Sequence, residues 1–141
     1  MEDVCGRFRG IQRIYLTPDG LGKADVEPNK LSLGACGGGA VQLAVATKVL
    51  ALAEGIETAL SILQATDIPT WACLGTSGLK ALQVPGNVRV IFIGADADRP
   101  GLRAAYEAAS RFLGENPERK VRVAVPPRGG ADWNDFLRAN V

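Results

Sequence analysis

The stretch VRVIFIGADADRPG, residues 88–101, decides the fold class of this chain. It opens with a nearly continuous apolar run, which is typical of a strand buried on both faces of a parallel sheet. Asp96 and Asp98 follow at once, and Pro100 stands near the start of a helical pattern, where its missing N–H is tolerated. Ligands of open α/β sheets bind beyond the carboxyl ends of the strands, so this stretch also predicts where function resides.

The same alternation of strand and helix continues on both sides of this stretch. Apolar spacing predicts helices that begin near Ile56 and near Pro100, and a last helix that begins at DWNDFL, residues 132–137. A short helix is expected over 75–82, with the Ser77 hydroxyl as its cap. Strands are predicted over 48–55, 70–74, 88–94 and 120–125. The order predicts an α/β fold with a mostly parallel, Rossmann-like sheet flanked by helices.

The N-terminal third of the chain has a different pattern. Residues 10–16, GIQRIYL, are predicted to form an edge strand that ends in a TPDG turn. Residues 34–40, GACGGGA, are interpreted as a turn, because no GxxxxGK[ST] motif and no helical pattern accompany the glycines. We therefore expect residues 1–47 to form a small antiparallel extension packed on a core domain of residues 48–141.

Composition excludes several classes of protein. The chain has 141 residues, of which 47% are hydrophobic, and a net charge of +1, which argues against broad electrostatic adhesion to nucleic acid. It has no histidine, and its three cysteines are too widely separated for a zinc ribbon. No apolar run is long enough for a membrane helix or a signal peptide, so the cytoplasm is the expected location.

Acidic residues follow three of the predicted strands. Glu54, the pair Asp96 and Asp98, and the pair Asp132 and Asp135 occupy these positions, and Glu57 follows one turn into the first helix. Carboxylates this close raise one another's pKa values, and a divalent cation such as Mg²⁺ relieves the repulsion. Taken singly, Asp98 and Asp132 are equally well explained as helix caps and Glu57 as a solvated helix residue. Acid clusters at strand ends also occur in receiver domains and hydrolases.

Four motifs in order resemble the Toprim domain, which primases, topoisomerases, certain nucleases and recombination proteins share. They are AEGIETALS (53–61), LGTSGL (74–79), IGADADRPGLRAA (93–105) and GGADWNDFL (129–137). The resemblance covers about residues 48–140 and is greatest to the primase-like Toprim domains of phage and plasmid replication proteins. Residues 10–24 resemble the segment that precedes the domain in those proteins.

The resemblance implies roles for the acids. It implies that Glu54 acts on the nucleotide or as a general acid/base, and that Glu54, Asp96 and Asp98 form the catalytic and Mg²⁺-binding set, with Mn²⁺ as an alternative metal. Asp132 and Asp135 resemble the trailing acidic motif, and together with Glu57 they are additional candidate acids. Many primases carry an acid four residues after the first glutamate, where this chain has Thr58. Candidate phosphate-binding residues are Thr76, Ser77, Lys80, Arg99, Arg103 and Arg128.

The function expected from the resemblance is Mg²⁺-dependent nucleotidyl transfer that makes RNA primers on DNA from nucleoside triphosphates. Companion zinc-ribbon and helicase domains are expected outside this chain. A Toprim-type nuclease, in which the metals activate water against a phosphodiester, is an alternative. A second alternative is a non-catalytic module that keeps the fold and recruits a replication or recombination partner.

Overall fold

The main sheet of the protein is mixed and mostly parallel. The computed structural model describes residues 1–126 and Trp133. Within them, five strands form one sheet in the order β3-β5-β4-β6-β7. Their bounds are β3 (Val41–Gln42), β4 (Val49–Ala53), β5 (Thr70–Ala72), β6 (Val90–Gly94) and β7 (Lys120–Ala124). All neighbouring pairs are parallel except β3 with β5, which is antiparallel, so the predicted sheet is confirmed.

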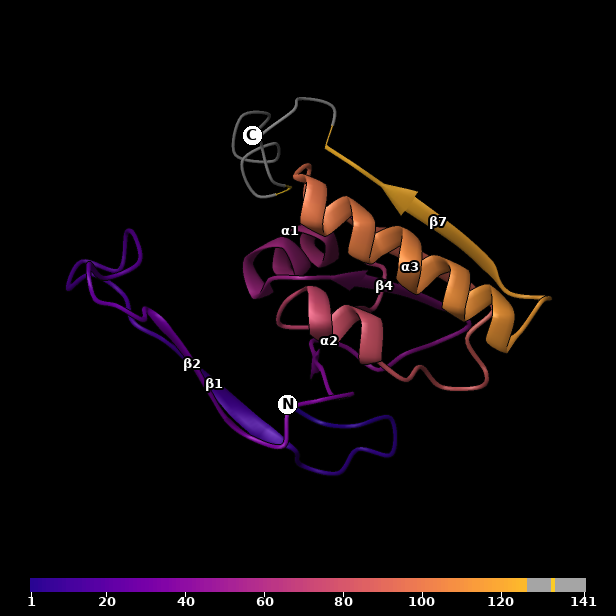
Figure 1. Ribbon diagram of the computed structural model, residues 1–141, viewed down its shortest axis with the longest axis horizontal. Coiled ribbons are helices and arrows are strands. Elements are labelled where there is room, and N and C mark those ends of the chain that lie inside the picture. The colour runs from indigo at the N-terminus through magenta and orange to yellow at the C-terminus, as the bar shows by residue number, and fades with distance from the viewer. Residues whose placement is uncertain (127–132, 134–141) are drawn as a thin grey trace.

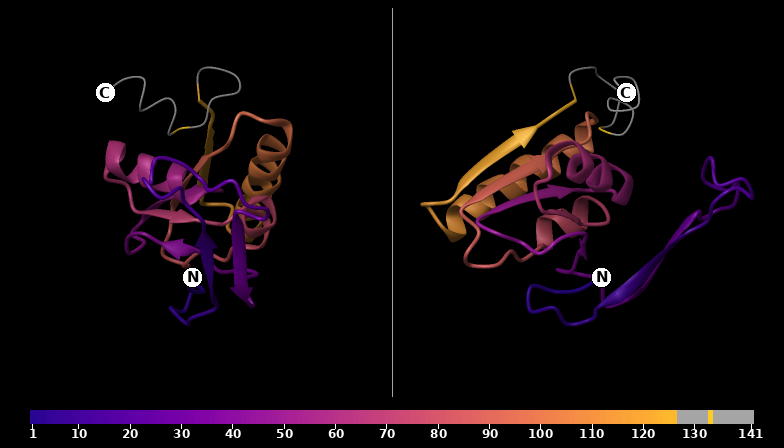
Figure 2. Two further views of the ribbon diagram at one scale, coloured as in Figure 1. Left: turned by 90° about the vertical axis from the view of Figure 1, so that its left-hand side faces the viewer. Right: turned by 180° about the vertical axis from the view of Figure 1, so that it is seen from behind.

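Helices cover both faces of this sheet. Helix α1 (Ile56–Thr66) lies on one face, and α2 (Thr76–Ala81) and α3 (Arg99–Glu115) lie together on the other (Figures 1 and 2). The helix expected at 132–137 falls outside the described residues except for Trp133. None of the helices in the described part of the chain is both long and apolar enough to span a membrane.

The core follows from the two-residue period of the strands. Leu50 and Leu52 of β4 face the α2/α3 side and pack in one large cluster with Ile91, Ile93 and other buried apolar residues. Alanines at the intervening positions face α1, where Ala53 belongs to a smaller cluster. Large side chains on one face and small ones on the other let α1 approach the sheet closely.

The first residues form a separate two-stranded antiparallel sheet. Strands β1 (Gly10–Ile14) and β2 (Lys30–Gly34) pair over their full length, and we refer to residues 10–34 as the N-terminal hairpin. Figures 1 and 2 show that the hairpin extends away from the body of the molecule and that its far end lies on the side toward which β7 points. Strand β2 was not predicted from the sequence, because Lys30–Gly34 carries polar and glycine residues among its leucines.

Candidate functional site

The topology of the sheet places a crevice between β4 and β6. The chain leaves β4 through α1 toward β5 on one side, whereas it leaves β6 through α3 toward β7 on the other side. Ligands of open α/β sheets bind at such a switch point, outside the carboxyl ends of the strands. Ala53 pairs with Gly94 across these strands; Glu54 directly follows Ala53, and Asp96 lies two residues after Gly94. Two of the predicted acids therefore meet at this point of the sheet.

Gly101, in the first turn of α3, is surrounded by three carboxyl-bearing residues. A methyl group on its Cα would lie 2.9 Å from Asp98 Oδ1, 3.0 Å from Glu54 Oε1 and 3.2 Å from Asp96 Cβ. The glycine thus leaves the space into which the acids of β4 and β6 converge. The structure brings Glu54, Asp96 and Asp98 together, as the sequence predicted.

Asp98 caps helix α3. Its Oδ1 accepts a hydrogen bond of 2.7 Å from the Gly101 backbone amide, and Pro100 occupies the first turn. The capping role that the sequence allowed for Asp98 is confirmed. Because the cap also fixes the start of α3, it holds Gly101 beside the acids.

Glu54 is the most electrostatically perturbed carboxyl of the site. Burial, followed by the negative charges of Asp96 and Asp98, raises its pKa from 4.5 to about 7. Only 9% of Glu54 is exposed, and none of the described residues donates a hydrogen bond to its buried Oε1. The expected rise in pKa among clustered acids is therefore found at this residue.

A tight turn after β5 supports the main chain of Glu54. Leu74 and Gly75 have positive φ values of 61° and 117°, and the Gly75 amide donates a hydrogen bond of 3.0 Å to the Glu54 carbonyl. The prediction that Ser77 caps the next helix is wrong: α2 begins at Thr76 with Gly75 at the N-cap position, so Ser77 already lies within the first turn.

Cys73, just before this turn, is not a candidate nucleophile. Burial raises the pKa of its thiol to about 12, so the thiol stays protonated near neutral pH.

Two cavities adjoin the acids. The first, which we call the acidic cavity, has a volume of about 250 Å³. The second, which we call the hairpin cavity, has a volume of about 460 Å³. The acidic cavity is lined by Gln12, Lys30, Glu54, Gly55, Leu74, Gly75 and Asp96. Lys30 and Asp96 line both cavities, so the N-terminal hairpin forms a wall of each.

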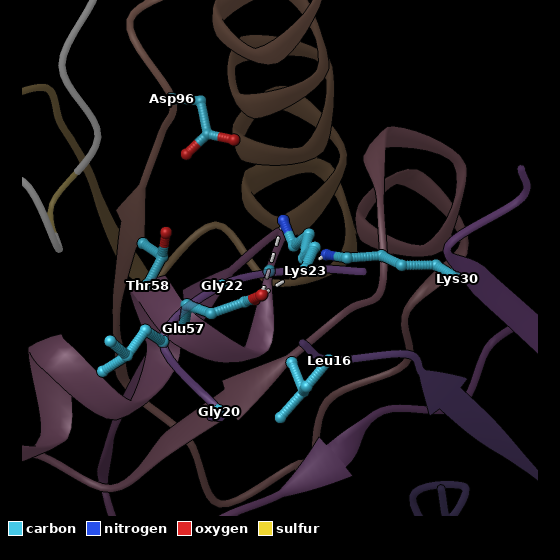
Figure 3. A pocket seen from close by; sticks show the side chains of 10 residues that line it. Leu16, Gly20, Gly22, Lys23, Lys30, Glu57, Thr58 and Asp96 are labelled. Carbon is cyan, nitrogen blue, oxygen red and sulfur yellow. Dashed lines mark ion pairs between the residues drawn. The ribbon is translucent and has the colours of Figure 1, made fainter. Parts of the chain in front are cut away.

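Glu57 faces the hairpin. Its Oε1 lies 3.6 Å from Lys23 Nζ and 3.7 Å from Lys30 Nζ, and Figure 3 shows both amino groups pointing toward it. Partial burial acts to raise the pKa of Glu57, but a hydrogen bond from its own backbone together with Lys30 and Lys23 lowers the pKa overall. Sequence reasoning missed both lysines, because no local pattern links a loop at 23–30 to a helix that begins at Ile56.

The predicted phosphate-binding residues are dispersed. Lys80 and Arg103 both pair with Glu107, each at 2.7 Å, which joins α2 to α3. Thr76, Ser77 and Arg99 lie at the starts of α2 and α3, and the described cavity linings do not include them. Arg128, Asp132 and Asp135 lie outside the described residues.

Comparison with known protein families decides the identity of the main domain. A sequence model of the Toprim domain matches residues 49–140, about two thirds of the chain. The chain belongs to the Toprim family. A second family model, of a domain of unknown function, matches residues 1–43. Comparison with curated proteins finds no match.

Solved structures that resemble this Toprim chain are catalytic cores of bacterial primases. They include a DNA primase domain from Pseudomonas aeruginosa (21% identity, TM-score 0.67), the E. coli primase catalytic core (20%, 0.67) and a DnaG primase catalytic domain bound to single-stranded DNA (22%, 0.67). Each match covers 99% of this chain but only 45–47% of the other. The likeness shows a shared fold, and the chain spans somewhat under half the length of these structures.

The acids of this Toprim domain suit a hard divalent cation. Toprim domains generally bind divalent metals such as Mg²⁺, which takes one or two protein carboxylates and completes its shell with water and phosphate oxygens. Within the described residues, no group of three or more potential ligands is arranged to hold a metal ion by itself. Glu54 and Asp96 both line the acidic cavity, and the buried Glu54 Oε1 lacks a hydrogen-bond donor there. The carboxylates of Glu54 and Asp96 therefore fit Mg²⁺ whose coordination shell is completed by water and by an anionic ligand such as a phosphate.

Proposed function

We propose that this Toprim domain catalyses Mg²⁺-dependent nucleotidyl transfer, joining ribonucleotides into a primer on single-stranded DNA. The observation that carries the proposal is the meeting of Glu54 and Asp96 at the switch point of the sheet, where the pKa of a buried carboxyl is about 7. A pKa near the working pH suits a group that must both take up and release a proton. The likeness in fold to primase cores supports the same choice.

In this proposal Glu54 accepts a proton, and Asp96 and Asp98 bind the metal ion. The 3′-hydroxyl oxygen of the growing primer attacks the α-phosphorus of the incoming nucleotide, pyrophosphate leaves, and the Glu54 carboxylate accepts the hydroxyl proton. Asp96, with Asp98 beside it, would hold Mg²⁺ at the edge of the acidic cavity. When bound, the cation supplies charge neutralisation and orientation of the phosphate oxygens. Burial of Glu54 keeps its proton affinity high until the substrate is in place.

The biological setting is part of the same proposal. We place the protein in the cytoplasm, in phage or plasmid replication, with zinc-ribbon and helicase domains supplied from outside the residues of this chain. Mg²⁺ is the expected metal, and Mn²⁺ is an alternative. DNA and nucleoside triphosphates are the proposed partners.

The test compares synthesis with cleavage on one substrate. The protein is incubated with Mg²⁺, ribonucleoside triphosphates and single-stranded DNA, and both labelled RNA products and nicked DNA are measured. We expect short RNA products, and none from the Asp96→Asn, Asp98→Asn double variant. Asparagine caps helices as well as aspartate, so the variant should keep its fold, which circular dichroism checks. Nicking without synthesis would instead identify a Toprim nuclease, and neither activity in the presence of intact DNA binding would identify a non-catalytic module.

A further inference from the structure

Strand β7 forms one edge of the main sheet. It pairs with β6 in parallel from Lys120 to Ala124, and no second strand lies beside it in the described part of the chain. Figures 1 and 2 show β7 at the margin of the sheet, alongside α3. One side of this strand therefore presents backbone N–H and C=O groups to which a further strand can bind.

The hydrogen bonds with β6 identify which residues of β7 point outward. The Lys120 amide donates a hydrogen bond of 2.8 Å to the residue before β6, and the Ala124 carbonyl accepts one of 2.9 Å from the residue after β6. Successive residues of a strand direct their N–H and C=O groups to opposite sides, so Lys120, Arg122 and Ala124 direct theirs toward β6. The N–H and C=O groups of Val121 and Val123 then point to the open side, which we call the β7 edge.

The side chains of β7 give this edge one basic and one apolar face. Lys120 and Arg122 are exposed on the α1 side of the sheet, and neither forms an ion pair with any residue that the structure describes. Val121 and Val123 lie on the side of α2 and α3, where they pack against the large core cluster. A strand that binds the β7 edge therefore meets two positive charges on one face and apolar groups on the other.

Helix α3 extends the apolar face past β7. Leu102, Tyr106, Ala109 and Leu113 recur at intervals of three and four residues and form one stripe of the helix. Residues that contact α2, such as Glu107, lie on the opposite flank, so the stripe faces the side of β7. Leu102 and Ala109 pack against the core cluster, whereas Tyr106 and Leu113 remain 59% and 42% exposed. A further strand beside β7 would cover these two side chains.

We propose that the β7 edge binds an extended segment of another protein in which acidic and apolar residues alternate. The segment adds one strand to the sheet through backbone hydrogen bonds to Val121 and Val123. Its acidic side chains pair with Lys120 and Arg122 on the α1 side, and its apolar side chains pack on Tyr106 on the α3 side. This binding does not depend on the reaction proposed for the acids.

Charge favours such a segment over a second copy of this chain. Antiparallel pairing of two β7 strands about Val121 places Lys120 opposite Arg122 of the second copy, and pairing about Arg122 places that arginine opposite itself. Like charges directly opposite one another destabilise a pair of strands. An acidic segment instead neutralises both positive charges.

Amide hydrogen exchange of the free protein tests whether this edge is open. The amides of Val121 and Val123 should exchange about ten-fold faster than the amide of Arg122, which is bonded to β6. Equal protection of all three amides in the monomer would show that the edge is already covered, and it would overturn the proposal. Protection of Val121 and Val123 that grows with protein concentration would identify a second copy as the occupant, and it would overturn the proposal as well.

A peptide of about six residues, in which glutamate alternates with valine, is the probe for binding. In an NMR titration it should slow exchange of the Val121 and Val123 amides, and a peptide with lysine in place of glutamate should not bind. Arg122→Glu should weaken binding about ten-fold, because repulsion replaces attraction. Arg13→Glu is the matched control, since Arg13 is an exposed arginine of β1 in the N-terminal hairpin. Equal affinity of the wild type and Arg122→Glu would refute the assignment of this edge.

Two further measurements separate strand addition from simple charge attraction. The same acidic peptide with methylated backbone nitrogens keeps its charges but cannot donate hydrogen bonds, so its binding should be lost. Tyr106→Ser should weaken binding of the unmethylated peptide several-fold and change the stability of the free protein little, because the side chain is largely exposed. Undiminished binding of the methylated peptide would rule out strand addition.

Discussion

Replacing Glu54 by glutamine should stabilise the metal-free protein at high pH. The substitution keeps the shape of the side chain and removes a carboxyl that is 9% exposed and whose pKa is raised to about 7 by burial and by the charges of Asp96 and Asp98. Above that pH the folded protein must hold Glu54 ionised beside two other acids, whereas the unfolded chain holds the same carboxylate in water. Glutamine carries no such penalty.

The pH dependence follows from proton linkage. Because the folded pKa of Glu54 lies above its ordinary value of 4.5, the folded state binds more protons between pH 4.5 and about 7, and its stability falls as the pH rises through that window. Each unit of difference corresponds to about 1.4 kcal/mol, so the full shift amounts to roughly 3 kcal/mol. The cavity beside the carboxyl is open to solvent, which reduces the expected effect to about 2 kcal/mol.

Urea unfolding, followed by the fluorescence of the buried Trp71, measures the effect. At pH 8 without Mg²⁺, Glu54→Gln should be more stable than the wild type by about 2 kcal/mol, and at pH 4.5 the two should be nearly equal. Mg²⁺ with nucleoside triphosphate should narrow the gap at pH 8, because the cation relieves the repulsion on the ionised Glu54 of the wild type, whereas the glutamine of the variant has no such charge to relieve. Glu118→Gln, at a side chain that is 86% exposed, is the control and should change little. A Glu54→Gln protein less stable than the wild type at pH 8, or a difference independent of pH, would refute the reasoning.

Substitutions at three positions test the surroundings of the acids. Asp98→Ala should destabilise the protein by about 1 kcal/mol through loss of the α3 cap, whereas Asp98→Asn should keep that stability; parallel urea titrations compare the two. Gly101→Ala adds a methyl about 3.0 Å from Glu54 Oε1, in the space between the acids. The affinity for Mg²⁺, measured by calorimetry, should therefore fall about ten-fold. An unchanged affinity would show that the acids do not bind the metal in this space. Gly78→Ala would place a methyl 1.8 Å from the Cys73 carbonyl oxygen, and we expect a loss of about 3 kcal/mol in unfolding free energy; a neutral result would mean that the turn after β5 differs from the one described.

The main sheet and its acidic edge were predictable because their signals are local. Apolar runs at 48–55 and 88–94 predicted β4 and β6, and acids directly after them predicted a site at the carboxyl ends. A cap at Asp98 was one of the two roles that the sequence allowed for this residue, since the helix pattern after it is visible in the chain. The exact start of α2 was not predicted. The turn at Gly75 and its hydrogen bond to the Glu54 carbonyl set that boundary, and Ser77 does not.

The sequence by itself determined which residues form parallel strands and that carboxylates follow them, since strand and helix periods are properties of neighbouring residues. Only the tertiary structure decided that Glu54 and Asp96 meet around Gly101, and that Lys23 and Lys30 of the hairpin meet Glu57. These contacts join positions far apart in the chain, and they depend on the order of the strands and on the placement of the hairpin. No short window of sequence contains either of them.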